Sequence, residues 1–141
     1  MKVLLITTIL LMVTTCFPIN PWKSFSPPSF NPSTHSLLKT VIDTTTSDII
    51  LYTPALSLSG NSMIIYCCNV TGSTVNQLST QSFTFTQVIS KTNIVIVKNE
   101  IFVSFYEGSS AYYARFEKLT LNRINKYSVV NRMGGVYIRP Y

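Results

Sequence analysis

Residues 93–121 decide the fold class of this chain, and they read NIVIVKNEIFVSFYEGSSAYYARFEKLTL. The breaks KNE (98–100) and EGSS (107–110) divide the stretch into three largely apolar segments. Ile, Val and Phe occupy every second position of 101–105, and apolar residues alternate with Arg and Glu across 112–117. A period of two places alternate residues on opposite faces of a β-strand. Short breaks between such segments favour antiparallel hairpins.

Strands are also predicted on both sides of this stretch. The segment 93–97 carries apolar residues on both faces, which is typical of a central strand in a packed sheet. Further strands are predicted at 48–58 with an interruption at Pro54, at 63–69, at 82–89, at 127–131 and at 136–138. No helical period persists over three turns. We therefore expect an all-β chain in which evenly spaced short strands form a sandwich or barrel.

The first sixteen residues have the three parts of a secretory signal peptide. Lys2 supplies the positive start, 3–13 is apolar, and small residues precede a cleavage point before Phe17. The apolar segment is shorter than the roughly 20 residues that span a bilayer. We therefore predict a protein secreted through the endoplasmic reticulum, without stable membrane insertion.

Residues 17–36 are predicted to form an extended proline-rich arm. Most of the prolines of the chain lie here, and proline fixes φ and removes a backbone donor. The arm also holds Trp22, Phe25 and Phe30, which we expect to dock onto the domain because exposed aromatic residues reduce solubility. The remaining residues, 37–141, fit one β-sandwich domain.

Positive charge is concentrated at the carboxy-terminal end. Acids and bases balance between Phe17 and Ala114, whereas beyond that point only Glu117 opposes six bases. These six are Arg115, Lys118, Arg123, Lys126, Arg132 and Arg139. They predict a patch for an anionic partner, with an ordinary solvated edge as the alternative. Nucleic acid is not an expected partner of an exported chain.

Cys67 and Cys68 are the only cysteines that follow the predicted signal peptide. Neighbouring residues on a strand point to opposite faces, so we expect one thiol in the core and the other directed outward. The two are poorly placed to bond each other. Because an exposed thiol tends to pair in an oxidising compartment, a disulfide-linked homodimer is predicted. The alternative is a buried thiol beside an unpaired surface thiol.

Asn69 begins the one acceptor sequence for N-linked glycosylation, Asn-Val-Thr, and we predict a glycan there at the end of a strand.

Catalysis has little support in the sequence. The single histidine, His35, lies in the Ser/Pro-rich segment, no activated serine motif is present, and no set of metal ligands is apparent. We expect no enzymatic activity, no cofactor and no metal.

The motif Ser104-Phe105-Tyr106-Glu107, followed by Tyr112 and Tyr113 and a strand ending Leu-Thr-Leu, resembles the small secreted immunoglobulin-like accessory proteins of coronaviruses. The resemblance covers about 20 residues and implies an immunoglobulin-like β-sandwich. Phe102 and Val103 stand where that family usually has a cysteine, and the usual core tryptophan is missing. The inter-sheet disulfide of the family is therefore not carried over.

Two functions are expected from these observations. The first is a secreted viral accessory glycoprotein that binds host surface or immune proteins and so modulates immunity, as the resemblance implies. The alternative is a structural or adhesive subunit of a virion or cell surface that binds anionic glycans through the basic end. An exported hydrolase without a recognised motif is a third possibility. Export and a β-scaffold without catalytic groups favour binding.

Overall fold

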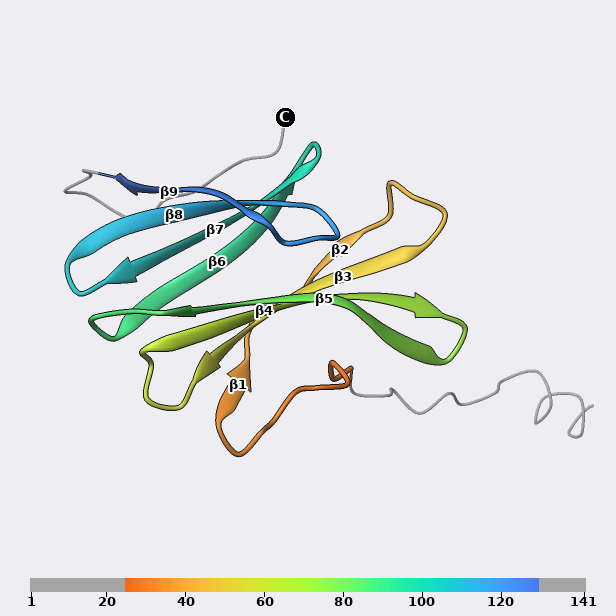
Figure 1. Ribbon diagram of the computed structural model, residues 1–141, viewed down its shortest axis with the longest axis horizontal. Coiled ribbons are helices and arrows are strands. Elements are labelled where there is room, and N and C mark those ends of the chain that lie inside the picture. The colour runs from red at the N-terminus through yellow and green to blue at the C-terminus, as the bar shows by residue number, and fades with distance from the viewer. Residues whose placement is uncertain (1–24, 130–141) are drawn as a thin grey trace, which may run out of the picture.

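The computed structural model describes residues 25–129, with side chains as far as Asn125, and these residues form two antiparallel β-sheets (Figure 1). The first sheet holds β1 (His35–Leu37), β2 (Val41–Asp43), β3 (Ile49–Ser57), β4 (Ser62–Thr71) and β5 (Thr74–Thr84). The second holds β6 (Ile89–Val97), β7 (Glu100–Glu107), β8 (Ser110–Glu117) and β9 (Arg123–Val129). The all-β prediction is confirmed. Within the described range, no helix could span a membrane.

Each sheet is built from strands that follow one another along the chain. The orders are β1-β3-β4-β5, with β2 also paired to β3, and β6-β7-β8-β9. Immunoglobulin sandwiches instead exchange strands between their two sheets. The described strands thus support a two-sheet sandwich, while an immunoglobulin-like relationship stays a proposal.

The main core lies between the two sheets. The first sheet contributes Ile50, Tyr52, Met63, Ile65 and Cys67, and the second contributes Ile94, Ile101, Val103, Phe105, Ala114 and Phe116. The predicted alternation in β7 and β8 is confirmed, because the apolar set of each strand is buried in this core. Leu121, from the β8–β9 connection, is also fully buried there.

A second, smaller core covers the outer face of the first sheet. Ala55, Tyr66 and Cys68 are buried on this face, and Phe25 and Phe30 pack against them. The Phe30 ring meets the Tyr66 ring edge-on, with centroids 6.5 Å apart. Docking of these two arm aromatics, as expected from the sequence, is confirmed. Trp22 and the rest of the arm before residue 25 lie outside the described residues, as does the predicted signal peptide.

Three strand predictions require correction. The predicted strand 82–89 is two strand ends: β5 stops at Thr84, the chain crosses between sheets, and β6 starts at Ile89. The segment 93–97 belongs to β6, which is an edge strand of its sheet. Pro54 does not interrupt β3. Its carbonyl accepts a hydrogen bond from Leu38 in the gap between β1 and β2, so its missing N–H faces that gap rather than a ladder partner.

The tight connections follow one pattern. Gly72-Ser73 and Gly108-Ser109 each join two paired strands, with φ of 60° and 59° at the glycines. A left-handed first residue followed by an ordinary one is the type II′ hairpin arrangement. Lys98-Asn99 adopts the same arrangement between β6 and β7, with φ of 54° at Lys98. The predicted hairpin at this position is confirmed.

Candidate functional site

Three connections come together at one end of the sandwich, in the upper part of Figure 1, where the β2–β3 loop lies to the right of the other two. They are the β2–β3 loop (44–48), the β6–β7 turn (98–99) and the β8–β9 loop (118–122). A pocket of about 440 Å³ lies between them. Its lining is Asp43, Thr45, Thr46, Ile50, Tyr52, Asn99, Glu117, Lys118 and Leu119. We call this region the loop end.

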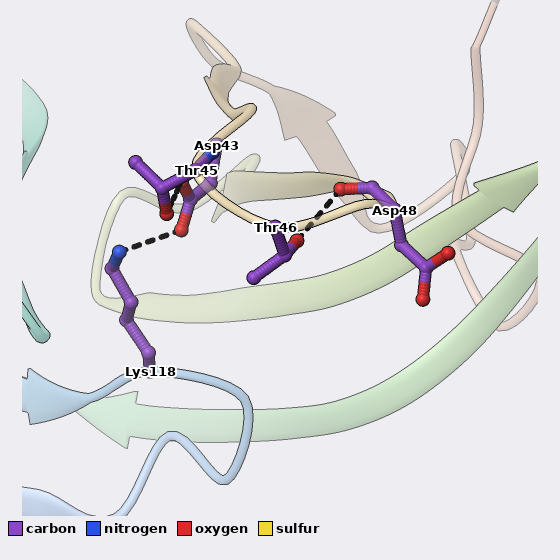
Figure 2. Close-up of polar contacts among 5 residues, drawn as sticks. All are labelled: Asp43, Thr45, Thr46, Asp48 and Lys118. Atoms are coloured by element: carbon purple, nitrogen blue, oxygen red, sulfur yellow. Dashed lines mark hydrogen bonds and ion pairs between the residues drawn. The ribbon is translucent and has the colours of Figure 1, made fainter.

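An ion pair between Asp43 and Lys118 joins the two sheets at the loop end (Figure 2). The Lys118 ammonium lies 2.6 Å from Asp43 Oδ2, and the two side chains are 16% and 3% exposed. The other carboxylate oxygen accepts from the Thr45 hydroxyl at 2.6 Å and from the Thr45 backbone N–H at 3.0 Å. Both carboxylate oxygens of Asp43 are therefore satisfied.

The pKa of Asp43 is below its ordinary value. Burial by itself raises that pKa, but the hydrogen bonds from Lys118 and Thr45 and the lysine charge outweigh it. The carboxylate is thus charged at neutral pH. A carboxylate held by a cation and two donors is a fixed structural anion and a poor proton acceptor.

The β2–β3 loop presents hydroxyl groups because Asp43 organises its first turn. The contacts from Thr45 to the aspartate form an Asx turn, and further along the Thr46 hydroxyl donates to the Asp48 carbonyl at 2.8 Å (Figure 2). The Asp48 side chain is exposed and points away from the ion pair in Figure 2. The loop therefore lines the pocket with threonines, and only Asp43 supplies charge from this side.

The β8–β9 loop holds two leucines in the left-handed region of φ, which ordinarily favours glycine. Leu119 has φ of 64° and is 47% exposed, while Leu121 has φ of 57° and is fully buried. Backbone hydrogen bonds from Leu121 N–H to Glu117 and from Lys118 N–H to Asn99 fix the loop. The Ser79 hydroxyl of β5 donates to the Leu119 carbonyl. Hydrogen bonds with Glu117, Asn99 and Ser79 therefore hold the loop in this conformation.

Tyr52 and Cys67 lie beneath the pocket. The Tyr52 hydroxyl is buried and makes no well-formed hydrogen bond, although the Leu119 backbone amide and the Cys67 thiol lie near it. Burial is the main cause that raises the pKa of Tyr52 and of Cys67. Cys67 is therefore a neutral thiol at physiological pH and not an activated nucleophile.

Reversible binding is the chemistry that this arrangement supports. The rim offers threonine hydroxyls, the Asn99 amide and the exposed Leu119 side chain. Within residues 25–129, no three His, Cys, Asp or Glu side chains are grouped so that they could hold a metal ion.

The six predicted patch residues do not share one environment in the described part of the chain. Lys118 is paired with Asp43, and Arg115 makes a two-pronged ion pair with Glu100 at 2.6 and 2.8 Å on the outer face of the second sheet. Arg123 is exposed at the start of β9. The side chains of Lys126, Arg132 and Arg139 lie outside the described residues. Whether the six bases act together stays a prediction.

The two cysteines point to opposite faces as predicted, but the expected outward-directed surface thiol is absent. Cys67 lies in the main core and Cys68 in the second core, and both are fully buried. The sequence prediction was wrong here because it left the outer face of the first sheet uncovered. A disulfide between two copies through either sulfur would require the covering residues to move.

Asn69 lies inside β4, paired with Ile50 and Asn76, rather than at its last residue. Its side-chain carbonyl oxygen is buried without a hydrogen-bond partner, whereas Thr71 of the acceptor sequence is exposed. Glycosylation at Asn69 stays a prediction.

The sequence indicated only Lys118 among the residues of the loop end. The hydroxyl-rich run 44–48 is visible in the sequence, but no local pattern predicts that Asn99 and Leu119 lie on the other side of the pocket from it.

No protein-family model, no curated protein and no solved structure matches the chain.

Proposed function

We propose that the protein is an exported β-sandwich that binds a host surface or immune protein through the loop end. Leu119 is the observation that carries this proposal. An apolar side chain at the rim of a polar pocket, left 47% exposed and held in a left-handed conformation, costs folding free energy that its partial burial only partly offsets. Strained residues of this kind cluster at binding and switch regions, where the strain serves function.

The surroundings of Leu119 suit a protein partner. An exposed apolar side chain ringed by hydroxyl and amide groups resembles a small interface centre with a polar rim. Loops that a rigid sheet scaffold positions commonly carry recognition. Because the connections here are fixed by the ion pair and by backbone hydrogen bonds, little ordering would be needed on binding.

The identity of the partner rests on the sequence. The resemblance around residues 104–107 favours a viral accessory glycoprotein that modulates immunity, and it favours an immunoglobulin-like relationship. The predicted signal peptide and the acceptor sequence at Asn69 support secretion as a glycoprotein. These parts of the proposal are independent of the loop-end geometry.

The test uses the exported chain against an array of purified host extracellular domains. Leu119→Gly removes the apolar side chain and relieves the left-handed strain, so the melting temperature should stay unchanged or rise slightly. Affinity for the bound domain should fall by roughly tenfold or more. The matched control is Leu58→Gly, since Leu58 is 66% exposed near the other end of β3. Equal losses in both variants, or no bound domain, would contradict the proposal.

The rival function, binding of anionic glycans through the six bases, makes a different prediction. Retention on heparin should fall steeply with salt and should be lowered by replacing Arg123, Lys126 and Arg132 with Gln. Leu119→Gly should leave that retention unchanged. Strong heparin binding without any protein partner would favour the rival.

A further inference from the structure

Strand β5 leaves one side of the first sheet without a neighbouring strand among the described residues. It runs from Thr74 to Thr84, pairs with β4 along one side, and ends the sheet order. Edge strands present unpaired backbone N–H and C=O groups that can pair with another chain. Proteins usually block such edges with charged residues, with proline or with a bulge.

Charge does not protect this edge. No Asp, Glu, Lys, Arg or His occurs between Asp48 and Lys91, so β3, β4 and β5 carry none, and β5 has no proline. The chain as a whole is basic, with a formal net charge of +6. Two copies that approach through β5 therefore meet through strands that carry no charge of their own, although Arg123 of β9 lines the same pocket as Thr84 at the end of β5.

A bulge and three side-chain contacts protect parts of the edge, and one of the contacts is the Gln81 amide, which donates to the Ser82 carbonyl at 3.3 Å and must turn away for a strand to pair there. The register between β4 and β5 shifts at Cys67 and Cys68, opposite Leu78. Close to that point Ser29 donates to the Gln77 side chain at 2.6 Å, and Ser79 donates to Leu119. From Ser79 to Thr84, by contrast, the strand pairs with β4 in unbroken register. Only Ser79, at one end of this segment, is bonded to the loop end, through the Leu119 carbonyl.

The geometry points to a second copy of this chain as the occupant of the edge at Ser79–Thr84. Antiparallel pairing about a two-fold axis is self-complementary, because the same segment supplies both partners. Opposed residues must lie on the same face, so one residue near the middle of the segment, Gln81 or Ser82, lies opposite its own copy across the axis. Thr80, Ser82 and Thr84 are exposed on one face, and cross-strand pairs of hydroxyl residues are favourable. This dimer needs no thiol, and it is independent of the proposed function.

The experiment measures the mass of the exported chain by sedimentation equilibrium in reducing buffer. The native chain should be a dimer that strengthens with salt, because screening weakens the long-range repulsion between two basic chains. Ser82→Lys should raise the dissociation constant by roughly tenfold or more, since like charges across paired strands are destabilising. The matched control is Ser109→Lys, which adds the same charge at the exposed β7–β8 turn and should leave the dimer intact.

A charge-swap experiment shows that any loss is due to pairing and not to misfolding. Ser82→Lys and Ser82→Glu should each be mainly monomeric with near-native melting temperatures, and an equimolar mixture should recover the dimer. A monomeric native chain, a Ser82→Lys chain that dimerises like the native one, or a mixture that stays monomeric would overturn the inference.

Discussion

Asp43 is almost completely removed from water, yet it is charged at neutral pH because Lys118 and Thr45 donate to its two oxygens. The pair joins the end of β2 in one sheet to the β8–β9 loop of the other. Removing one member leaves the other charge partly buried without compensation, which costs more than the intact pair contributes. The position of the loop end therefore depends on this contact.

Asp43→Asn should lower the free energy of unfolding by roughly 1–3 kcal/mol, as measured by urea denaturation, because Lys118 loses its counter-charge and Thr45 loses a charged acceptor. The matched control is Asp48→Asn. Asp48 is exposed in the neighbouring loop, and only its backbone carbonyl accepts the hydrogen bond from Thr46. Replacing its side chain should therefore change stability by less than about 0.5 kcal/mol. Similar losses in both variants would contradict the assigned role of Asp43.

The same pair predicts a dependence on pH. The pKa of Asp43 in the folded chain lies below its ordinary value of 3.8, so its contribution is complete above that value. The contribution is lost as pH falls through the folded pKa, when the unfolded chain binds the proton more readily. The difference in unfolding free energy between native protein and Asp43→Asn should therefore shrink below pH 4. A difference that stays constant from neutral to acidic pH would contradict this.

At the scale of single elements, one of the three type II′ turns holds a residue other than glycine at a positive φ. Lys98 occupies a position that glycine fills at residues 72 and 108. Because glycine adopts a positive φ without steric cost, Lys98→Gly should raise the free energy of unfolding by roughly 0.5–1 kcal/mol. Thermal and urea unfolding measure this. Gly72→Ala is the reverse control: a Cβ there meets nothing within 4 Å, so only backbone strain is added and stability should fall. Destabilisation by Lys98→Gly would show that the lysine side chain stabilises the turn.

Strands with apolar residues at every second position could be predicted from the sequence, and strands without this pattern could not. Alternation in β7 and β8 identified Ile101, Val103 and Phe116 as core residues because burial selects apolar side chains at every second position. Most of β5 was missed, since an edge strand of Thr, Asn, Gln and Ser has little apolar pattern to read. The two phenylalanines that suggested the strand 82–89 do both reach the core, but Phe85 does so from the connection after β5.

At the scale of the whole molecule, the loop end was beyond sequence reasoning because three connections distant along the chain form it. Asp43 and Lys118 are 75 positions apart, and nothing local to either predicts the other. The sequence predicted that the arm aromatics dock onto the domain, but not where they dock. Alternation showed that Cys67 and Cys68 face opposite ways, but only the folded chain shows that Phe25 and Phe30 return across the outer face.

The second core makes the reactivity of Cys68 a measure of arm docking. The thiol is fully buried, and burial raises its pKa to about 11, so in the native chain it should react very slowly with a thiol reagent at neutral pH. Phe30→Ala removes the ring that covers Tyr66 beside it. In a background with both Cys16→Ala and Cys67→Ala, which isolates Cys68, this change should speed labelling strongly and lower stability by roughly 1–3 kcal/mol. Phe85→Ala is the control, because Phe85 packs against Phe105 in the other core and its loss should destabilise the fold while Cys68 stays covered. Rapid labelling of Cys68 before any change at Phe30 would mean that the arm does not cover it, and an exposed thiol would again be available for a disulfide between two copies.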